Sequence, residues 1–597
     1  MPEGTRLDVL NDIQDWFNDP NAKPVYWLQG MAGTGKTSVS LTVADALNAY
    51  RPLAGGEFAT SPAVFLGGSF FFKQGDATRN TTEKFYTTIA SQLAHKFPDL
   101  MVHITKYLRS FPAVATKQHK DQFQHLILTP LSLVDQTKFL SIRLIIIIDA
   151  LDECKDLKEV KDLMGMLENV QTLCQVQLRF FVTSRADDHI VDGFKQLPKG
   201  LYHKKVLEKI QYQEGEVGQT DDITRFLVHQ LSKIAKEKGL PQNWISDEDV
   251  ANLSKKADGL FIYAATTCRL LDINDICNRQ NRQGLLSLVL DDATYHEAPQ
   301  QKIDEIYDKV LRFQRLNLLT ASARKGFFTS MKRMLGFIVT FFEPVPVSSL
   351  VKFLSEWVEK PDVDDMLRQL HAVISVPEEE GASLRVLHLS FRDFLLSEDR
   401  AGKSFFAVPA EKSIPAEKLA WWIEESLMHR AVFERCLGIM SQELRQDICD
   451  LVLPGLIVSH LDPKQVQSRI SPTLQYACCY WARHMEQLSH EQIPKVGLRD
   501  GGKVDEFLRQ KLLFWLEAMC LLRKSSTAVH VVIQLSTLVK VCPSKSIQDS
   551  ESPRLASFLH GSQRNQRWPN EIRPWFLSSR VILALFSRSH SRHRRIF

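Results

Sequence analysis

The sequence predicts an α/β domain, in which a parallel sheet is covered by helices on both faces, followed by mainly helical domains. Four short β-rich runs alternate with helical patterns before about residue 210, namely Val25–Leu28, Ala63–Phe72, Leu144–Ile148 and Leu178–Val182. Apolar strands separated by helices are typical of a parallel sheet that is buried on both faces. After about residue 215 the strand pattern largely vanishes, which indicates helical domains.

Two helices of the first domain can be placed from their apolar spacing. Residues 1–24 predict a short lead-in helix. Apolar residues four apart predict a second helix over Thr82–Phe97, which Pro98 ends. Farther along the chain, a β-like run at Ser383–Leu389 interrupts an otherwise helical pattern.

The composition is ordinary for a soluble globular protein. The 597 residues suffice for three or four domains, and 44% of them are hydrophobic and 24% charged. The net charge of +4 gives no general case for nucleic-acid binding. From Glu551 onward, however, nine arginines against two glutamates give the tail a charge of +7, and we expect it to be poorly ordered.

The sequence also predicts an intracellular, cytoplasmic chain. Its N-terminal residues lack the apolar core of a signal peptide, and no apolar run approaches 18 residues, so we expect no membrane span. The ten cysteines show no metal-ligand spacing, and we expect free thiols in a reducing compartment. No repeat of 20–50 residues is visible and no Trp is followed by Asp, so no WD-repeat propeller is predicted.

A phosphate-binding loop follows the first predicted strand. Residues 30–37 read Gly-Met-Ala-Gly-Thr-Gly-Lys-Thr, the spacing of the nucleoside triphosphatase P-loop, and a helical pattern follows. Backbone N–H groups of such a loop point at the phosphates, Lys36 reaches the β- and γ-phosphates, and the Thr37 hydroxyl ligates Mg²⁺. The candidate nucleotide ligands are Gly30, Gly33, Thr34, Gly35, Lys36, Thr37 and Ser38. The alternative is a structural Gly-rich turn.

Acidic residues follow the third predicted strand. Asp149 comes directly after Leu144–Ile148, and Asp152 and Glu153 follow one turn later. A buried strand that delivers acids at its carboxyl end is what a Mg²⁺–nucleotide site needs beside a P-loop. We therefore expect Asp149 to hold the metal with Thr37, and Asp152 or Glu153 to orient or deprotonate the attacking water. The alternative is a helix N-terminus, where acids are favoured anyway.

The fourth predicted strand ends in a cation. Residues 179–185 read Arg-Phe-Phe-Val-Thr-Ser-Arg, and Arg185 at the mouth of the sheet can contact the γ-phosphate and respond to its loss. The alternative is a solvated arginine at a strand end.

Together these motifs resemble the NACHT branch of the signal-transduction ATPases with numerous domains (STAND). The Asp149–Glu153 string is similar to that branch's Walker B motif and Thr183-Ser184-Arg185 to its sensor strand. The similarity is strongest to fungal NACHT proteins of the heterokaryon-incompatibility type, whose NTPase domain also resembles the nephrocystin-like N-terminal domain. Further matching stretches are Trp27–Thr37, residues 69–72, residues 259–264, His388–Leu395 and Leu474–His484.

The resemblance implies a domain order and two more site segments. It divides the chain into a lead-in helix, a P-loop (NACHT) domain, a helical domain, a winged-helix-like domain, a second helical domain and a tail, over residues 1–24, 25–214, 215–299, 300–404, 405–545 and 546–597. In the winged-helix segment, His388 matches the histidine that NACHT receptors place on the β-phosphate of ADP. Residues 4–6 resemble the adenine-side segment. The alternative for His388 is a structural histidine between a strand and a helix.

The family likeness implies a nucleotide-operated switch with weak ATPase activity, which binds ATP or ADP with Mg²⁺. It also implies that the chain self-associates on activation and acts with related NACHT proteins. The setting that it implies is fungal non-self recognition or programmed cell death. One alternative is a STAND-type transcription regulator, although residues 300–400 show no dense basic helix. The other is a truncated decoy of full-length relatives, since we expect no effector domain before the NTPase and no repeat array after it.

Overall fold

The chain folds into two compact units in the computed structural model. The first contains residues 1–317, 369–375 and 386–394, and the second contains residues 318–368, 376–385 and the chain from Leu395 onward. The structure describes residues 4–541 apart from residues 54–62, 75, 77, 112–113, 115–117, 135–141, 169–175, 199, 208–221, 242–243, 273–278, 291–297, 313–320, 378, 380, 404, 409–416, 452–460 and 490–501. The predicted basic tail, 546–597, lies outside the described residues.

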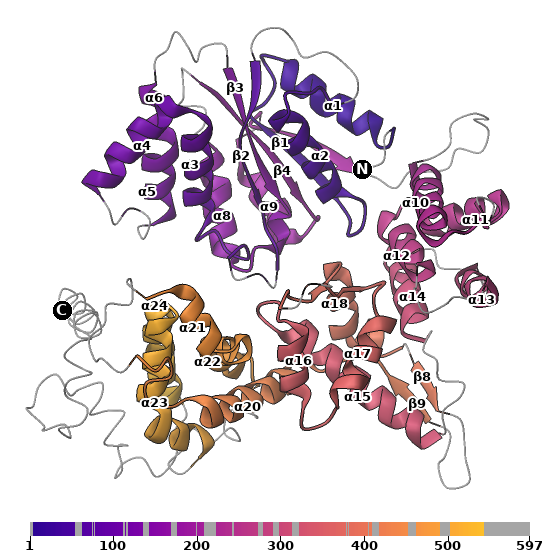
Figure 1. The fold of residues 1–597 in the computed structure, drawn as a ribbon. Helices are drawn as coiled ribbons and strands as arrows, with labels where there is room; N and C mark the ends of the chain where they lie inside the picture. Colours follow the sequence, from indigo (N-terminus) through magenta and orange to yellow (C-terminus); the bar gives the residue numbers. More distant parts are fainter. Residues whose placement is uncertain are drawn as a thin grey trace, which may run out of the picture. The chain divides into compact units, whose positions relative to one another are not determined.

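A five-stranded parallel sheet forms the centre of the first unit (Figure 1). Its strands are β1 (Val25–Gly30), β2 (Ala63–Phe71), β3 (Ile142–Asp149), β4 (Gln177–Ser184) and β5 (Tyr202–Leu207). Their order is β2-β3-β4-β1-β5, and every neighbouring pair is parallel. This confirms the predicted α/β class. Strand β4, which leads to Arg185, therefore lies between β1, which leads to the P-loop, and β3, which ends at Asp149.

Helices cover both faces of the sheet, and alternate strand residues separate the two cores. On one face Leu144, Ile146 and Ile148 pack with helices from the middle of the domain, and on the other Ile145 and Ile147 pack with α1 and α2. The first group is α3 (Phe85–Lys96), α4 (Pro98–Ser110), α5 (His119–Phe123), η2 (Gln124–Leu128), α6 (Thr129–Leu133), α8 (Leu157–Leu167) and α9 (Asp188–Gln196). The second is α1 (Leu7–Asn18) and α2 (Lys36–Asn48). Because successive residues of a strand such as β3 enter opposite apolar cores, the strand reads as a continuous apolar run in the sequence.

Two buried arginines fasten the C-terminal end of α1 to the sheet. On β3, Arg143 donates from Nη1 to the carbonyl oxygens of Phe17 (2.5 Å) and Asn18 (2.8 Å). On β4, Arg179 donates from Nη1 to the carbonyl oxygen of Trp16 at 2.5 Å and from Nη2 to that of Asp19 at 2.7 Å. The last carbonyls of a helix lack intrahelical donors and carry partial negative charge, so a buried guanidinium satisfies them.

Helices follow the sheet in the first unit, as the sequence predicts. They are α10 (Asp222–Lys238), α11 (Asp247–Ala257), α12 (Phe261–Leu271), α13 (Arg279–Leu290) and α14 (Pro299–Arg312). The segments 369–375 and 386–394 belong to the same unit and carry β6 (Ile374–Ser375) and most of α18 (Leu389–Leu396). In this unit Tyr307 of α14 packs against Phe391 and Phe394 of α18, with ring centroids 5.0 and 5.7 Å apart.

The second unit is mainly helical. Its helices are α15 (Ala321–Thr340), α16 (Val347–Leu354), α17 (Lys360–Gln369), α19 (Glu398–Ala401), α20 (Glu425–Glu443), α21 (Pro463–Arg469), α22 (Pro472–Glu486), α23 (Lys503–Leu521) and α24 (Ser525–Val541). It also contains an antiparallel pair, β8 (Phe405–Val408) and β9 (Glu417–Ala420), within the region predicted to be helical. Helices α20 and α22 pack closely, and the buried Cys478 of α22 is a free thiol.

Two local predictions differ from the structure in detail, and one strand was not predicted. The helix predicted over Thr82–Phe97 begins later, at Phe85, and Pro98 both ends it and starts α4. Proline suits the first turn of a helix because its missing N–H would have no partner there. Strand β5 is not predicted by the sequence. The β-like run at Ser383–Leu389 contains only a two-residue strand, β7 (Arg385–Val386), before α18 begins at Leu389.

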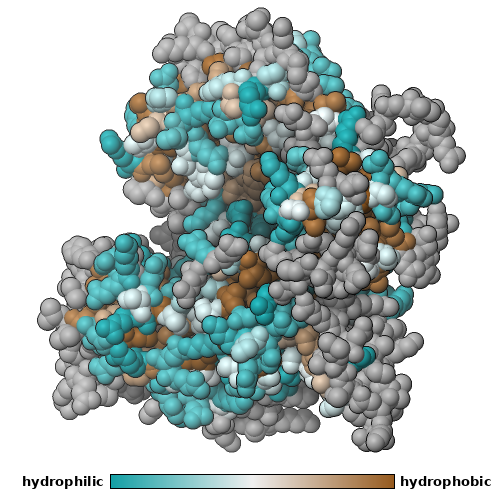
Figure 2. Space-filling view, turned by 45° about the vertical axis from the view of Figure 1, so that its right-hand side comes forward, coloured by the Kyte–Doolittle hydropathy of each residue, from teal (hydrophilic) through white to brown (hydrophobic). Residues whose placement is uncertain are grey.

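The described surface carries no large continuous apolar face on the side drawn in Figure 2, where hydrophobic residues reach the surface in separate patches among hydrophilic ones. Exposed large hydrophobic side chains include Met31, Leu41 and Trp357. Among the described residues, no helix has both the length and the apolar character that a membrane span needs.

Candidate functional site

The P-loop connects β1 to the N-terminus of α2. Gly33 and Gly35 have positive φ angles, +78° and +94°, and Gly35 is the N-cap residue of α2. No side chain in the described part of the chain caps this helix, and its first turn contains no acidic residue. A helix N-terminus with free N–H groups and no competing carboxylate attracts an anion.

The N-terminus of α12 packs against this loop. Ile262 donates its backbone N–H to the carbonyl oxygen of Gly33 at 3.2 Å. A Cβ placed on Gly33 would lie 2.1 Å from Cγ2 of Ile262. Position 33 therefore needs glycine for two reasons, its positive φ and the close approach of α12. The sequence predicts the first requirement but gives no sign of the second.

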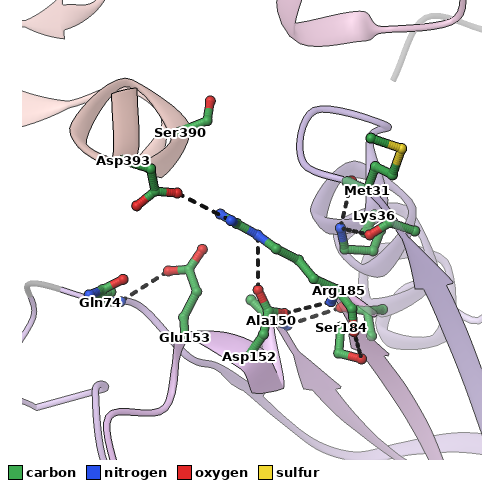
Figure 3. A network of polar contacts seen from close by, with 12 residues as sticks. Met31, Lys36, Gln74, Ala150, Asp152, Glu153, Ser184, Arg185, Ser390 and Asp393 are labelled. Atoms are coloured by element: carbon green, nitrogen blue, oxygen red, sulfur yellow. Dashed lines mark hydrogen bonds and ion pairs between the residues drawn. The ribbon is translucent and has the colours of Figure 1, made fainter. Parts of the chain in front are cut away.

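Lys36 lies over the backbone of its own loop. Its Nζ donates to the carbonyl oxygens of Gly30 (2.7 Å) and Met31 (2.9 Å), as Figure 3 shows. Burial lowers the pKa of the ammonium, and the charge of Asp152 opposes that shift. The cation is thus already held beside the place where the P-loop motif puts phosphate.

Other loop residues lie where their predicted roles need them. Thr34 is buried and donates from Oγ1 to the carbonyl oxygen of Met31 at 2.9 Å. Thr37 and Ser38 are exposed residues in the first turn of α2. Arg6 is also buried at the loop, where its Nη2 donates to the carbonyl oxygen of Thr34 at 3.1 Å.

Asp149 is a buried carboxylate surrounded by hydroxyl groups. Its Oδ1 accepts from Oγ of Ser40 at 2.6 Å and from Oγ1 of Thr183 at 2.7 Å. Burial raises the pKa of Asp149, and the hydrogen bonds from Ser40, Thr183 and Thr37 oppose that shift. The predicted metal pair, Thr37 and Asp149, is therefore in contact. Ser40 was not predicted as part of the site, although it lies one turn after Lys36 on α2.

Arg185 extends across the carboxyl end of the sheet (Figure 3). Its Nε lies 3.2 Å from Oδ2 of Asp152, and its backbone N–H donates to Oδ1 of the same residue at 2.9 Å. At its far end, Nη1 lies 3.2 Å from Oδ2 of Asp393 on α18. Burial lowers the pKa of Arg185, but Asp393 and Asp152 raise it by more, so the guanidinium stays charged.

Glu153 contacts the loop that follows β2. Its Oε2 accepts the backbone N–H of Gln74 at 3.0 Å. Burial raises the pKa of Glu153 to about 7, and the charge of Asp152 adds to the shift. A carboxyl that titrates near neutral pH can take up a proton, which is the property that a general base requires.

His388 occupies one defined tautomer. Its Nδ1 lies 3.2 Å from the backbone nitrogen of Ser390 and 2.6 Å from Oγ of that residue. Since a backbone N–H can only donate, Nδ1 is the acceptor and the ring proton is on Nε2. Burial, Arg185 and Lys36 lower the pKa of His388 to about 4, so the ring is neutral at pH 7. A neutral imidazole with a proton on Nε2 can donate to a phosphate oxygen.

The structure thus brings most of the predicted site residues to one end of the sheet, and adds Asp393. This aspartate lies within the matching stretch His388–Leu395, but no pattern in the sequence pairs it with Arg185. Only a structure can connect two residues that are 208 positions apart.

The residues fit a nucleotide with Mg²⁺. Two positive-φ glycines and an uncapped helix N-terminus form an anion cradle. The hydroxyl of Thr37 and the carboxylate of Asp149 are hard oxygen ligands of the kind that Mg²⁺ prefers. Fold and site together define a P-loop nucleoside triphosphatase domain.

Comparison with known proteins narrows this class. The family model "Nephrocystin 3, N-terminal" matches residues 4–185. The vegetative incompatibility protein HET-E-1 of Podospora anserina is 24% identical over 549 residues, a match that covers 89% of this chain and 36% of HET-E-1. The chain thus spans about a third of the length of that relative. Both matches support a resemblance of the chain to NACHT-like STAND nucleoside triphosphatases.

Solved structures are more distant. A STAND protein with a tetratricopeptide repeat sensor from Pyrococcus horikoshii is 16% identical with a TM-score of 0.32, covering 90% of this chain and 64% of its own. The Drosophila ORC bound to DNA is 13% identical with a TM-score of 0.28, covering 71% and 85%. At these TM-scores neither structure adds to the fold assignment.

Proposed function

We propose that the chain is a nucleotide-operated STAND switch that binds ATP and ADP with Mg²⁺ and hydrolyses ATP slowly. The observation that carries the proposal is the meeting of Lys36, Asp149, Arg185 and His388 at one end of one sheet, in one compact unit. The charges of Lys36 and Arg185 both act on His388, so the three groups lie within electrostatic reach.

Each residue has a role in this proposal. Lys36 binds the β- and γ-phosphates, and Thr37 and Asp149 hold the metal, whose charge lowers the barrier to phosphoryl transfer when it is bound. The carboxyl group of Glu153, with a pKa of about 7, accepts a proton from the attacking water, while Asp152 orients it. Arg185 binds the γ-phosphate.

In this proposal, His388 makes the affinity for ADP differ from the affinity for ATP. Its Nε2 proton is donated to the β-phosphate of ADP, so the segment 386–394 stays on the nucleotide in the ADP state. A switch requires that the two conformations bind the two nucleotides with different affinities. We infer that ATP weakens the His388 contact and releases this segment.

The biological role is proposed from similarity to HET-E-1, whose name describes vegetative incompatibility. We place the chain in the cytoplasm, in fungal non-self recognition or programmed cell death. There the ATP state is the one that self-associates and assembles with related NACHT proteins.

The test is nucleotide content and differential affinity. Purified full-length protein is denatured and its nucleotides are separated by chromatography, and Kd values for fluorescent ADP and ATP are measured by titration. We expect the wild type to retain ADP. In His388→Ala we expect a loss of about 10- to 100-fold in ADP affinity with little change for ATP, since one charge-assisted hydrogen bond contributes about 1.5–3 kcal/mol. His95→Ala, an exposed histidine on α3, is the control. A protein that neither retains nor binds either nucleotide overturns the proposal.

A further inference from the structure

The Arg185 guanidinium is shared between two carboxylates that belong to different parts of the first unit. Asp152 contacts Nε at 3.2 Å and Asp393 contacts Nη1 at 3.2 Å. Figure 3 shows the side chain stretched between them. Asp152 is nearly buried, with 5% of its side chain exposed, whereas 30% of the Asp393 side chain is exposed.

The two contacts differ in how firmly they are held. Asp152 lies in the short helix η3 (Leu151–Glu153), directly after β3, and also accepts the backbone N–H of Arg185. Because Arg185 contacts Asp152 through both its side chain and its backbone N–H, this pair is fixed at the carboxyl end of the sheet. Asp393 has a single contact to Arg185, through one nitrogen. The Asp393 pair is therefore the one that can break without disturbing the sheet.

Asp393 lies on the same short segment as His388. Ser390 connects His388 to α14, since its Oγ is 2.6 Å from Nδ1 of His388 and 2.6 Å from the hydroxyl of Tyr307. Ring contacts from Phe391 and Phe394 to Tyr307 hold the segment on α14. Asp393 and His388 therefore belong to one segment that packs on α14.

We propose that Asp393 is a latch residue that competes with the γ-phosphate of ATP for Arg185. This rests on the proposed function, because the competitor is a nucleotide. With ADP, no γ-phosphate is present, and Arg185 holds Asp393 and with it the segment 386–394. With ATP, the γ-phosphate takes the same guanidinium nitrogens, the Asp393 pair breaks, and the segment is released. One cation thus distinguishes the two nucleotides.

The competition has a physical reason in the charges. A guanidinium with one phosphate and one carboxylate gains a bidentate contact, but a second carboxylate beside a triphosphate adds repulsion. Asp393 is that second carboxylate, and its partial exposure lets it be resolvated when it leaves. Asp152 is too buried to leave at similar cost.

The experiment measures the ratio of ADP to ATP affinity in full-length protein. Asp393→Asn keeps the size of the side chain and removes its charge, and we expect the ratio to shift about five- to tenfold toward ATP, with faster release of fluorescent ADP. Asp393→Glu should restore part of the wild-type ratio. Asp399→Asn, the same change at an exposed position on α19, is the matched control and should leave the ratio unchanged.

A double-mutant cycle separates the latch from a general effect of substitution. In an Arg185→Gln background, Asp393→Asn should no longer shift the ratio, because the shared cation is absent. An equal shift in both backgrounds, or a single variant that keeps the wild-type ratio within twofold while binding both nucleotides, overturns the latch and leaves the proposed function standing. A wild-type chain that binds no nucleotide instead overturns the proposed function. Melting curves without nucleotide show whether each variant is folded.

Discussion

The hydroxyl of Thr183 donates a hydrogen bond to Oδ1 of Asp149 at 2.7 Å and accepts the backbone N–H of Ala150 at 3.0 Å. It therefore ties the ends of β3 and β4 together at the acidic end of the site. Ala150 has a positive φ of 54°, which is unusual for a residue with a Cβ. The pair of hydrogen bonds at Thr183 supports this strained turn and fixes the direction in which Asp149 points.

We predict that Thr183→Val destabilises the protein by about 1–3 kcal/mol, because it leaves the buried Asp149 without one donor and the Ala150 N–H without its acceptor. Unfolding in urea, followed by circular dichroism without nucleotide, measures the change. Thr87→Val is the control, since the hydroxyl of Thr87 donates only to a carbonyl on an exposed part of α3, and its effect should stay within about 0.5 kcal/mol. Equal stabilities of the two variants would contradict the assigned role.

Lys36→Ala should reduce the affinity for both ADP and ATP by about 100-fold or more, because the variant loses the charge-assisted hydrogen bonds to phosphate. Isothermal titration in Mg²⁺ buffer measures this. Lys23→Ala removes an exposed lysine just before β1 and should bind nucleotide like the wild type. Unchanged affinity in Lys36→Ala would place the nucleotide elsewhere.

Gly33→Ala should destabilise the P-loop by about 1–3 kcal/mol, since its φ of +78° is unfavourable for alanine and the new Cβ would collide with Ile262. Thermal melts with and without ADP report the loss. The double variant with Ile262→Ala should recover only part of it, because that change removes the collision and not the backbone strain. Full recovery would show that the collision alone matters.

Glu153 gives the stability a predictable pH dependence. Its pKa is raised to about 7 in the folded protein, above the ordinary value of 4.5, so the folded state binds the proton more tightly than the unfolded state. The stabilisation from this group is full below pH 4.5 and is lost as pH rises through about 7.

Glu153→Gln removes this dependence. We expect it to stabilise the protein at pH 8 by roughly 1–3 kcal/mol and to have little effect at pH 5. Urea unfolding at the two pH values measures the difference. Glu248→Gln, an exposed glutamate at the start of α11, should show no such pH-dependent gain. A larger gain at pH 5 than at pH 8 would mean that the pKa is not raised.

The sequence predicts the strands of the sheet where strand residues are apolar on both faces. The four predicted runs coincide with β1 to β4, apart from Phe72, which follows β2, because alternate residues of these strands enter two apolar cores. Strand β5 could not be found in this way. It lies at the edge of the sheet, and its residues His203, Lys204 and Lys205 face solvent or a salt bridge with Asp12.

The candidate site was predictable where one residue type performs one local task. The P-loop glycines and Lys36 follow from spacing, and Asp149 follows from its place after a buried strand. Contacts between distant segments could not be predicted. The collision that excludes a side chain at Gly33 comes from Ile262, and the second partner of Arg185 comes from Asp393, and neither pair has a pattern within the sequence.

The arginines that hold the end of α1 have a consequence for the loop at its other end. Arg6 is the N-cap of α1 and contacts Thr34, while Arg143 and Arg179 hold the last turn. The 12 residues of α1 rise about 18 Å, close to the height of a six-residue strand, about 20 Å. The helix therefore spans the sheet from the carboxyl ends of its strands, where the P-loop lies, to their amino ends, where Arg143 and Arg179 hold it. One inserted residue would turn Arg6 by about 100° and withdraw it from the nucleotide loop.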